Sequence, residues 1–178
     1  MEDNKKLPNV KFTARRFEED GKIRGPMFGR NLRGEKTEYN TEGKRRFCVY
    51  IDPQKLDIDL MKKDGLPVKY TRPRKDDPYA DEFVPKPYFE VEAQYIKKDG
   101  TPAMYPPTIS VLTENGPVYY DETMLNEVFD KARIEYVNLE LYPRWYDVMN
   151  RKGYKMILRK AEFKFEDDDS GDTSYWEQ

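Results

Sequence analysis

Apolar and polar residues alternate along five segments of this chain, and this alternation constrains the fold more than any other feature. The segments are 10–14, 47–51, 89–95, 137–141 and 156–165. Successive side chains of a β-strand point to opposite faces of a sheet, so a period of two residues predicts strands with one buried face. Phe47, Val49 and Ile51 share one face, and we expect Phe47 in the core. Arg46 and Tyr50 take the other face, where they either meet a ligand or are simply exposed.

The last of these segments changes phase partway along its length. Met156 and Leu158 lie in one phase, whereas the apolar residues of 161–165 lie in the other. One extra residue that shifts the alternation without ending the strand is typical of a β-bulge, and strands that bend around a barrel often contain one. We therefore predict a bulge near Arg159 and Lys160.

Two short helices are expected between the strands. Asp52 can cap a first helix with Pro53 at its first position, and Gly65 can end it. Asp121 can cap a second helix, because apolar residues follow at helical spacing over 124–129. Five to seven strands, short helices and long Pro-rich loops favour a small antiparallel barrel or sandwich over a parallel α/β fold.

Charge is distributed unevenly along the chain. The net charge is −2, but residues 166–178 hold six acids and no base, which leaves +4 for the preceding residues. Residues 22–46 alone hold eight bases and three acids. A run of acids is usually disordered and solvated, so we expect one domain over 1–165 and a disordered acidic tail over 166–178.

Several classes of function find no support in the residue types. The chain has no histidine, which removes Ser-His and Cys-His nucleophilic pairs and His-containing zinc sites. The single cysteine, Cys48, lies in an apolar strand, where we expect a buried thiol and not a nucleophile. The acids of 76–82 match no calcium loop, and neither a P-loop nor a GxGxxG motif is present. We expect no catalytic residue, no cofactor and no metal.

The chain also lacks the signatures of membrane insertion and export. No segment approaches the roughly 20 apolar residues of a transmembrane helix, and the first ten residues lack the apolar core of a signal peptide. We expect a cytoplasmic protein without a membrane partner.

Basic and aromatic residues are interleaved in three stretches, 15–50, 70–74 and 142–146. Proteins that hold single-stranded nucleic acid combine cations that follow the phosphates with aromatic faces on which bases stack. The candidate contacts are Arg16, Arg24, Phe28, Arg30, Arg33, Lys36, Tyr39, Arg45, Arg46, Tyr50, Tyr70, Arg72, Arg74 and Trp145. Two alternatives stay open: residues 30–36 can form an ordinary solvated loop, and Trp145 can plug the end of a strand.

The acidic tail ends in two aromatic residues, which are costly to leave without a partner. The candidate docking residues are Asp167, Asp168, Asp169, Tyr175 and Trp176. Such a segment can lie in the basic groove when nucleic acid is absent, or dock on partner proteins through its aromatic anchor. Simple solubilisation is the alternative.

Four segments, in this order and spacing, resemble a phage-type single-stranded DNA-binding protein with an OB fold. They are MFGRNLRGEKTEYNTEGKRRFCVYID, DGLPVKYTRPR, PPTISVLTENGPVYYDETMLNEVFDKARIEYVNLELYPRWYDV and KGYKMILRKAEFKF, followed by the acidic tail. The resemblance covers most of residues 25–167 and implies a mainly β, OB-fold-like five-stranded Greek-key barrel with extra strands, long loops and one or two short helices. It also implies strand binding without sequence preference. The contacts it favours are Arg30, Asn31, Tyr39, Arg45, Arg46, Tyr70, Arg72 and Trp145.

Three hypotheses of function result. The first is a non-enzymatic binder of single-stranded DNA, with RNA left open, that serves replication or recombination in a phage-infected bacterial cell and meets replication or recombination proteins through its tail. The second is a protein-interaction or structural module that uses the basic loop and the acidic tail. The third is a carboxylate-dependent nuclease that uses Asp76 and Asp77. A homodimer is compatible with any of them.

Overall fold

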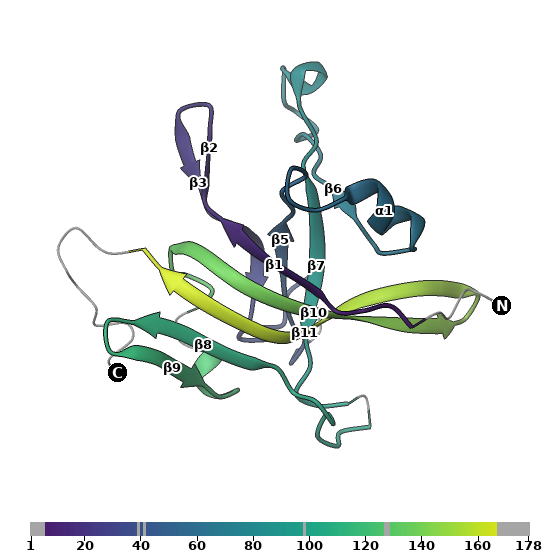
Figure 1. Ribbon diagram of the computed structural model, residues 1–178. Coiled ribbons are helices and arrows are strands. Elements are labelled where there is room, and N and C mark those ends of the chain that lie inside the picture. The colour runs from purple at the N-terminus through teal and green to yellow at the C-terminus, as the bar shows by residue number, and fades with distance from the viewer. Residues whose placement is uncertain (1–5, 39, 41, 98, 127–128, 167–178) are drawn as a thin grey trace.

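The computed structural model of the protein describes residues 6–38, 40, 42–97, 99–126 and 129–166, and these residues form a mainly β structure (Figure 1). The strands are β1 (Val10–Arg15), β2 (Phe17–Glu19), β3 (Lys22–Arg24), β4 (Met27–Asn31), β5 (Arg45–Tyr50), β6 (Lys69–Tyr70), β7 (Pro87–Ala93), β8 (Thr108–Thr113), β9 (Gly116–Tyr120), β10 (Ile134–Val148) and β11 (Arg151–Phe165). The helical elements are α1 (Ile58–Lys63) and two 3₁₀ turns, η2 (Ala80–Glu82) and η3 (Met124–Asn126). The expected mainly β class is confirmed, and the architecture is consistent with an OB-like fold.

Most strands belong to one mixed sheet. Its main path runs β1-β10-β11-β7-β5-β4, with β6 added to β7 and the β8–β9 hairpin added to β11. Strand β11 is antiparallel to β10 but parallel to both β7 and β8. The sheet is therefore not purely antiparallel as the alternation alone suggested, because a period of two does not depend on strand direction. The β2–β3 hairpin forms a separate two-stranded sheet that projects from the large one (Figure 1).

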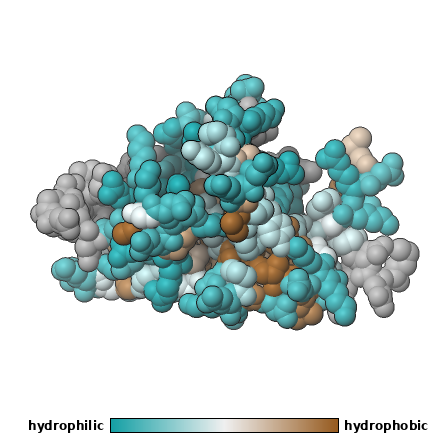
Figure 2. Space-filling model, turned by 90° about the horizontal axis from the view of Figure 1, so that it is seen from above, coloured by the Kyte–Doolittle hydropathy of each residue, from teal (hydrophilic) through white to brown (hydrophobic). Residues whose placement is uncertain are grey.

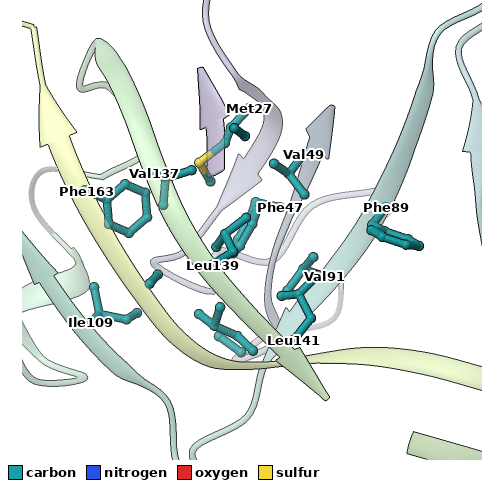
Figure 3. Close-up of a cluster of buried hydrophobic side chains, with 14 of the residues drawn as sticks. Met27, Phe47, Val49, Phe89, Val91, Ile109, Val137, Leu139, Leu141 and Phe163 are labelled. Carbon is teal, nitrogen blue, oxygen red and sulfur yellow. The ribbon is translucent and has the colours of Figure 1, made fainter. Parts of the chain in front are cut away.

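The core lies on the inner face of this curved sheet (Figure 3). In β5, Phe47 and Val49 are fully buried, and in β7 so are Phe89 and Val91. Leu139 of β10 packs into the same cluster. The predicted inward face of each of these strands is confirmed. The face that Figure 2 shows is mainly hydrophilic, with apolar residues gathered in a few places.

The predicted bulge in the last strand is confirmed. Glu140 of β10 pairs with Lys160, whereas the next residue, Leu141, pairs with Leu158. Arg159 is therefore the extra residue on β11. It shifts the alternation so that apolar residues on both sides of the bulge reach the same core.

The first of the two helices is shorter than the sequence-based expectation. The first helix begins at Ile58 and not at Pro53, because Asp57 is the residue whose carboxylate accepts the cap hydrogen bond, from the Leu60 N–H at 3.0 Å. Asp52 instead forms a local turn and accepts from the Gln54 N–H at 2.9 Å. The predicted stop holds, since α1 ends just before Gly65. Asp121 caps the second segment as predicted, accepting from the Met124 N–H at 3.0 Å, and the described part of that segment is the short η3 turn.

Candidate nucleic-acid interface

A cleft of about 1230 Å³ opens between the β2–β3 hairpin, the outer ends of β4, β5 and β7, and the segment 68–86. Its lining is rich in aromatic and basic side chains. The lining residues are Phe17, Glu19, Arg24, Phe28, Tyr50, Val68, Lys69, Tyr70, Thr71, Arg72, Arg74, Phe83, Val84, Pro85, Lys86 and Tyr88. We call this site the aromatic cleft.

Four aromatic rings form the floor of the aromatic cleft. Tyr50 lies 5.2 Å from Phe17 and 4.8 Å from Phe28, centroid to centroid, and Phe28 lies 5.0 Å from Tyr88. Tyr50 and Tyr88 are paired across β5 and β7. The inward neighbours of Tyr50 and Tyr88, such as Val49, fill the core, so strand alternation directs the tyrosines outward. All four rings are half-buried and therefore keep part of their surface accessible.

Three arginines stand at the rim of this aromatic floor. Arg24, Arg72 and Arg74 are all exposed. Arg24 lies 4.0 Å from the carboxylate of Glu19. Within the described ranges, no carboxylate pairs with Arg72 or Arg74. Their guanidinium groups are therefore available to phosphate oxygens, which they match geometrically as two-pronged donors.

Two lysines also line the cleft, each beside an acid. The Lys86 ammonium lies 4.0 Å from the centroid of the Phe17 ring and pairs with Glu19. Burial lowers the pKa of Lys86. Lys69 donates to Glu90 at 2.7 Å, and this hydrogen bond raises the pKa of Lys69. Both lysines are thus paired with carboxylates, unlike Arg72 and Arg74 in the described part of the chain.

The comparisons with known proteins bear directly on this arrangement. Residues 15–176 match the family described as "Putative phage ssDNA-binding domain". The match spans nearly the whole chain and includes every residue of the aromatic cleft. The chain belongs to this family. Its predicted relationship to phage-type single-stranded DNA-binding proteins is thereby confirmed, and single-stranded DNA is the partner that the family indicates. No curated protein and no solved structure matched the chain.

Six of the predicted contact residues meet in the aromatic cleft of this phage ssDNA-binding domain. They are Arg24, Phe28, Tyr50, Tyr70, Arg72 and Arg74. Sequence reasoning overlooked Lys69, Lys86 and Tyr88. Tyr88 could have been found, because it precedes the buried Phe89 and so falls on the outer face of its strand. The two lysines carried no comparable signal, since they lie in short or irregular segments.

Two of the predicted arginines are directed into the protein. Arg30 donates to the carbonyl oxygens of Phe129 and Ala132, at 3.0 and 2.6 Å. Burial lowers the pKa of Arg30, and the negative charge of Asp130 offsets part of this shift. Arg45 is buried, donates to the carbonyl of Leu32 and lies 3.4 Å from Glu122. Arg30 thus attaches β4 to residues 129–132, whereas Arg45 joins β5 to Leu32 and Glu122, and the donors of both satisfy backbone carbonyls.

The loop after β4 is ordered by its own polar contacts. The Asn31 amide donates to the Glu35 carbonyl at 2.9 Å, and its oxygen accepts from the Glu35 N–H at 2.8 Å. Arg33 pairs with Glu35 and lies 3.9 Å from Asp130. Lys36 is exposed, and Tyr39 lies outside the described residues. Asn31, Arg33 and Lys36 do not line the aromatic cleft.

The remaining predicted contacts are dispersed. Arg16 pairs with Glu135 at 3.5 Å and with Glu166 at 3.2 Å. Arg46 pairs with Glu90 at 2.9 Å, next to Lys69.

Trp145 lies within β10, where its ring is 5.1 Å from that of Tyr154, and it packs against the core. The candidate tail residues Asp167, Asp168, Asp169, Tyr175 and Trp176 lie outside the described residues.

Two other findings concern function. In the part of the chain that the structure describes, no three acidic or cysteine side chains converge on a potential metal site. Among the same residues, no helix has the length and apolar character needed to cross a membrane.

Proposed function

We propose that the domain binds single-stranded DNA without base preference in the aromatic cleft and that it acts as a binding protein and not as an enzyme. The observation that supports this most strongly is the meeting of four aromatic rings with Arg24, Arg72 and Arg74 in one cleft. Every base presents a π face, and stacking on an aromatic side chain contributes about 1–3 kcal/mol per base. The floor rings supply stacking surfaces, and the rim arginines follow the phosphates.

The charge of the rim gives the proposal a measurable signature. Each phosphate contact releases condensed counterions, so affinity for a single strand falls with salt by a slope of about 0.7 per contact. Arg72 and Arg74 are exposed and project from a segment that contributes little to the core. Their removal therefore tests binding with little effect on folding.

The decisive experiment is an anisotropy titration of labelled oligo-dT at low and high salt. Wild-type protein is expected to bind, with affinity falling as salt rises. The double variant Arg72→Ala, Arg74→Ala is expected to bind more weakly and to lower the magnitude of the salt slope by about 1.4, because two phosphate contacts are lost. The matched control is Lys131→Ala with Arg133→Ala, two exposed bases outside the cleft, which should leave the slope nearly unchanged.

The same titration separates the alternatives. A protein-interaction module would ignore dT and show concentration-dependent assembly in sedimentation. A matched rU oligomer reports on RNA, which stacking and phosphate contacts alone do not distinguish from DNA. We propose replication or recombination as the process served, with the acidic tail over 166–178 either competing for the cleft or docking partner proteins.

A further inference from the structure

The β10–β11 hairpin extends beyond the rest of the sheet as a two-stranded ribbon (Figure 1). Strand β11 pairs with β7 only at Met156 and Ile157, and β10 pairs with β1 only as far as Leu141. Between Met156 and Arg151 the two strands pair only with each other within the described residues. At about 3.3 Å per residue, this part of the ribbon projects about 16 Å.

Cross-strand aromatic contacts stiffen the base of the ribbon. Trp145 is paired with Tyr154, and their rings lie 5.1 Å apart. Tyr146 lies across Gly153, where an added Cβ would come within 3.2 Å of the Tyr146 hydroxyl. Tyr154 in turn lies beside Gly65, just after α1, where an added Cβ would come within 3.5 Å of its ring. These contacts support the base of the ribbon.

The tip of the ribbon is apolar although it is exposed. Val148 is 52% exposed and Met149 is 91% exposed. Met149 and Asn150 form the two-residue turn, with φ angles of 50° and 67°. Turns of this kind favour Asn and Gly, and a bulky side chain is rarely found at positive φ. Neither turn geometry nor core packing calls for a methionine at this position, which points to a contact outside the domain.

Basic residues lie next to the tip and in a hollow at the base of the ribbon. Arg151 is exposed next to the turn. A hollow of about 210 Å³ begins at Tyr146 and Tyr154 on the ribbon and includes Arg46 and Lys69. Lys69 also lines the aromatic cleft. The other lining residues of the hollow are Lys44, Pro67, Glu90, Glu92, Lys155 and Met156. The hollow therefore joins the aromatic cleft to the base of the ribbon, and its bases Arg46, Lys69 and Lys155 pair there with Glu90 and Glu92.

We propose that the ribbon engages the junction between single-stranded and duplex DNA and that Met149 inserts into the base stack at the first base pair. This inference rests on the proposed function, because the single strand leaving the junction would lie in the aromatic cleft. Apolar wedges, methionine among them, unstack base steps in other DNA-binding proteins, and flanking cations hold the phosphates. The ribbon would thus recognise the junction and open its terminal base pair, while the aromatic cleft captures the single strand.

The test uses a duplex with a single-stranded dT tail and 2-aminopurine in the first base pair, where fluorescence rises when the base unstacks. Wild-type protein and Met149→Leu, which keeps the apolar bulk, are expected to raise the fluorescence. Met149→Gly removes the wedge and suits the positive φ of the turn. It is expected to lose most of the rise while binding oligo-dT with wild-type affinity. Met149→Asn is a second variant compatible with the turn.

Each outcome decides the inference. An equal rise with Met149→Gly and Met149→Asn would overturn it. A parallel loss of oligo-dT affinity in both variants would also overturn it, since the tip would then belong to the single-strand site. Wild-type protein that binds dT but leaves 2-aminopurine unchanged overturns only this inference. Wild-type protein that fails to bind dT at all contradicts the proposed function itself.

Discussion

The rings of Phe28 and Tyr50 lie 4.8 Å apart, centroid to centroid, on the outer face of β4 and β5. Their chain neighbours Met27 and Val49 are buried on the opposite face and are paired with each other. The same strand pair thus contributes apolar residues to the core and aromatic residues to the cleft. The pairing of β4 with β5 therefore positions both these two floor rings and the core residues beneath them.

Loss of one floor ring should weaken binding without unfolding the domain. Tyr50→Ala is expected to reduce oligo-dT affinity by about 5- to 150-fold, corresponding to one stacked base at about 1–3 kcal/mol. Tyr119→Ala, at an exposed position outside the cleft, is the matched control and should bind normally. Anisotropy titration measures both, and Tyr50→Ala with wild-type affinity would exclude stacking on this ring.

Replacement of Arg45 by alanine should lower the free energy of unfolding, whereas replacement of Arg72 should not. Arg45→Ala leaves the buried Leu32 carbonyl without this donor, so the free energy of unfolding is expected to fall by about 1–3 kcal/mol. Arg72→Ala at the exposed rim should change it by less than about 0.5 kcal/mol. Urea denaturation followed by circular dichroism compares the two. Equal stabilities would mean that Arg45 is not a structural residue.

The Glu90 carboxylate should make the free energy of unfolding depend on pH in the acid range. Burial raises its pKa, but hydrogen bonds and charges from Lys69 and Arg46 outweigh burial, so the pKa lies below its ordinary value. A lowered pKa stabilises the folded state above the unfolded pKa, near 4.5, and this contribution disappears as pH falls through the folded pKa.

Glu90→Gln removes the titrating group, so its stability should decline less steeply than that of the wild type between pH 6 and pH 3. Urea midpoints at each pH provide the measurement. Parallel profiles would show that Glu90 does not contribute.

Cys48 should react slowly in the folded protein. Burial raises its pKa to about 11, with a further contribution from Glu90. Since the thiolate is the reactive form, Ellman's reagent at pH 8 should modify the native thiol on the order of 100-fold more slowly than the unfolded one. The chain has a single cysteine, so the reaction reports on this site alone. Equal rates would mean that the thiol is accessible and that folding does not raise its pKa.

Removal of the acidic tail should tighten binding if the tail competes with DNA. Glu166 pairs with Arg16 and its N–H donates to the Arg133 carbonyl, so truncation after Glu166 preserves these contacts. The shortened chain is expected to bind oligo-dT more tightly, most clearly at low salt, where electrostatic competition is least screened. Unchanged affinity at low salt would assign the tail to docking or solubility.

Alternation made β1, β5, β7, β10 and β11 and their buried faces predictable, but not the other strands. In β11 even the bulge at Arg159 was predictable, because an inserted residue leaves a visible change of phase. The start of α1 was not, since Asp52 and Asp57 are equally good caps by residue type. Which of them caps the helix depends on the path that the chain takes between β5 and β6.

Local sequence could not separate the arginines of the basic stretch. Arg30 and Arg45 bind backbone carbonyls that are distant along the chain or across the loop, whereas Arg24 stays at the rim of the cleft. A guanidinium group suits a carbonyl and a phosphate equally well. Residue type therefore predicted a basic element but not which of its members face outward.

The sequence by itself determined the mainly β class, the inward faces of the strands and the bulge, because these follow from the order of apolar and polar residues along a strand. Only the tertiary structure decided that Tyr50, Tyr88 and Arg72 share one cleft, since residues of different strands and loops approach each other only through the pairing of β4, β5 and β7. Strand pairing depends on long-range packing, which no local pattern encodes.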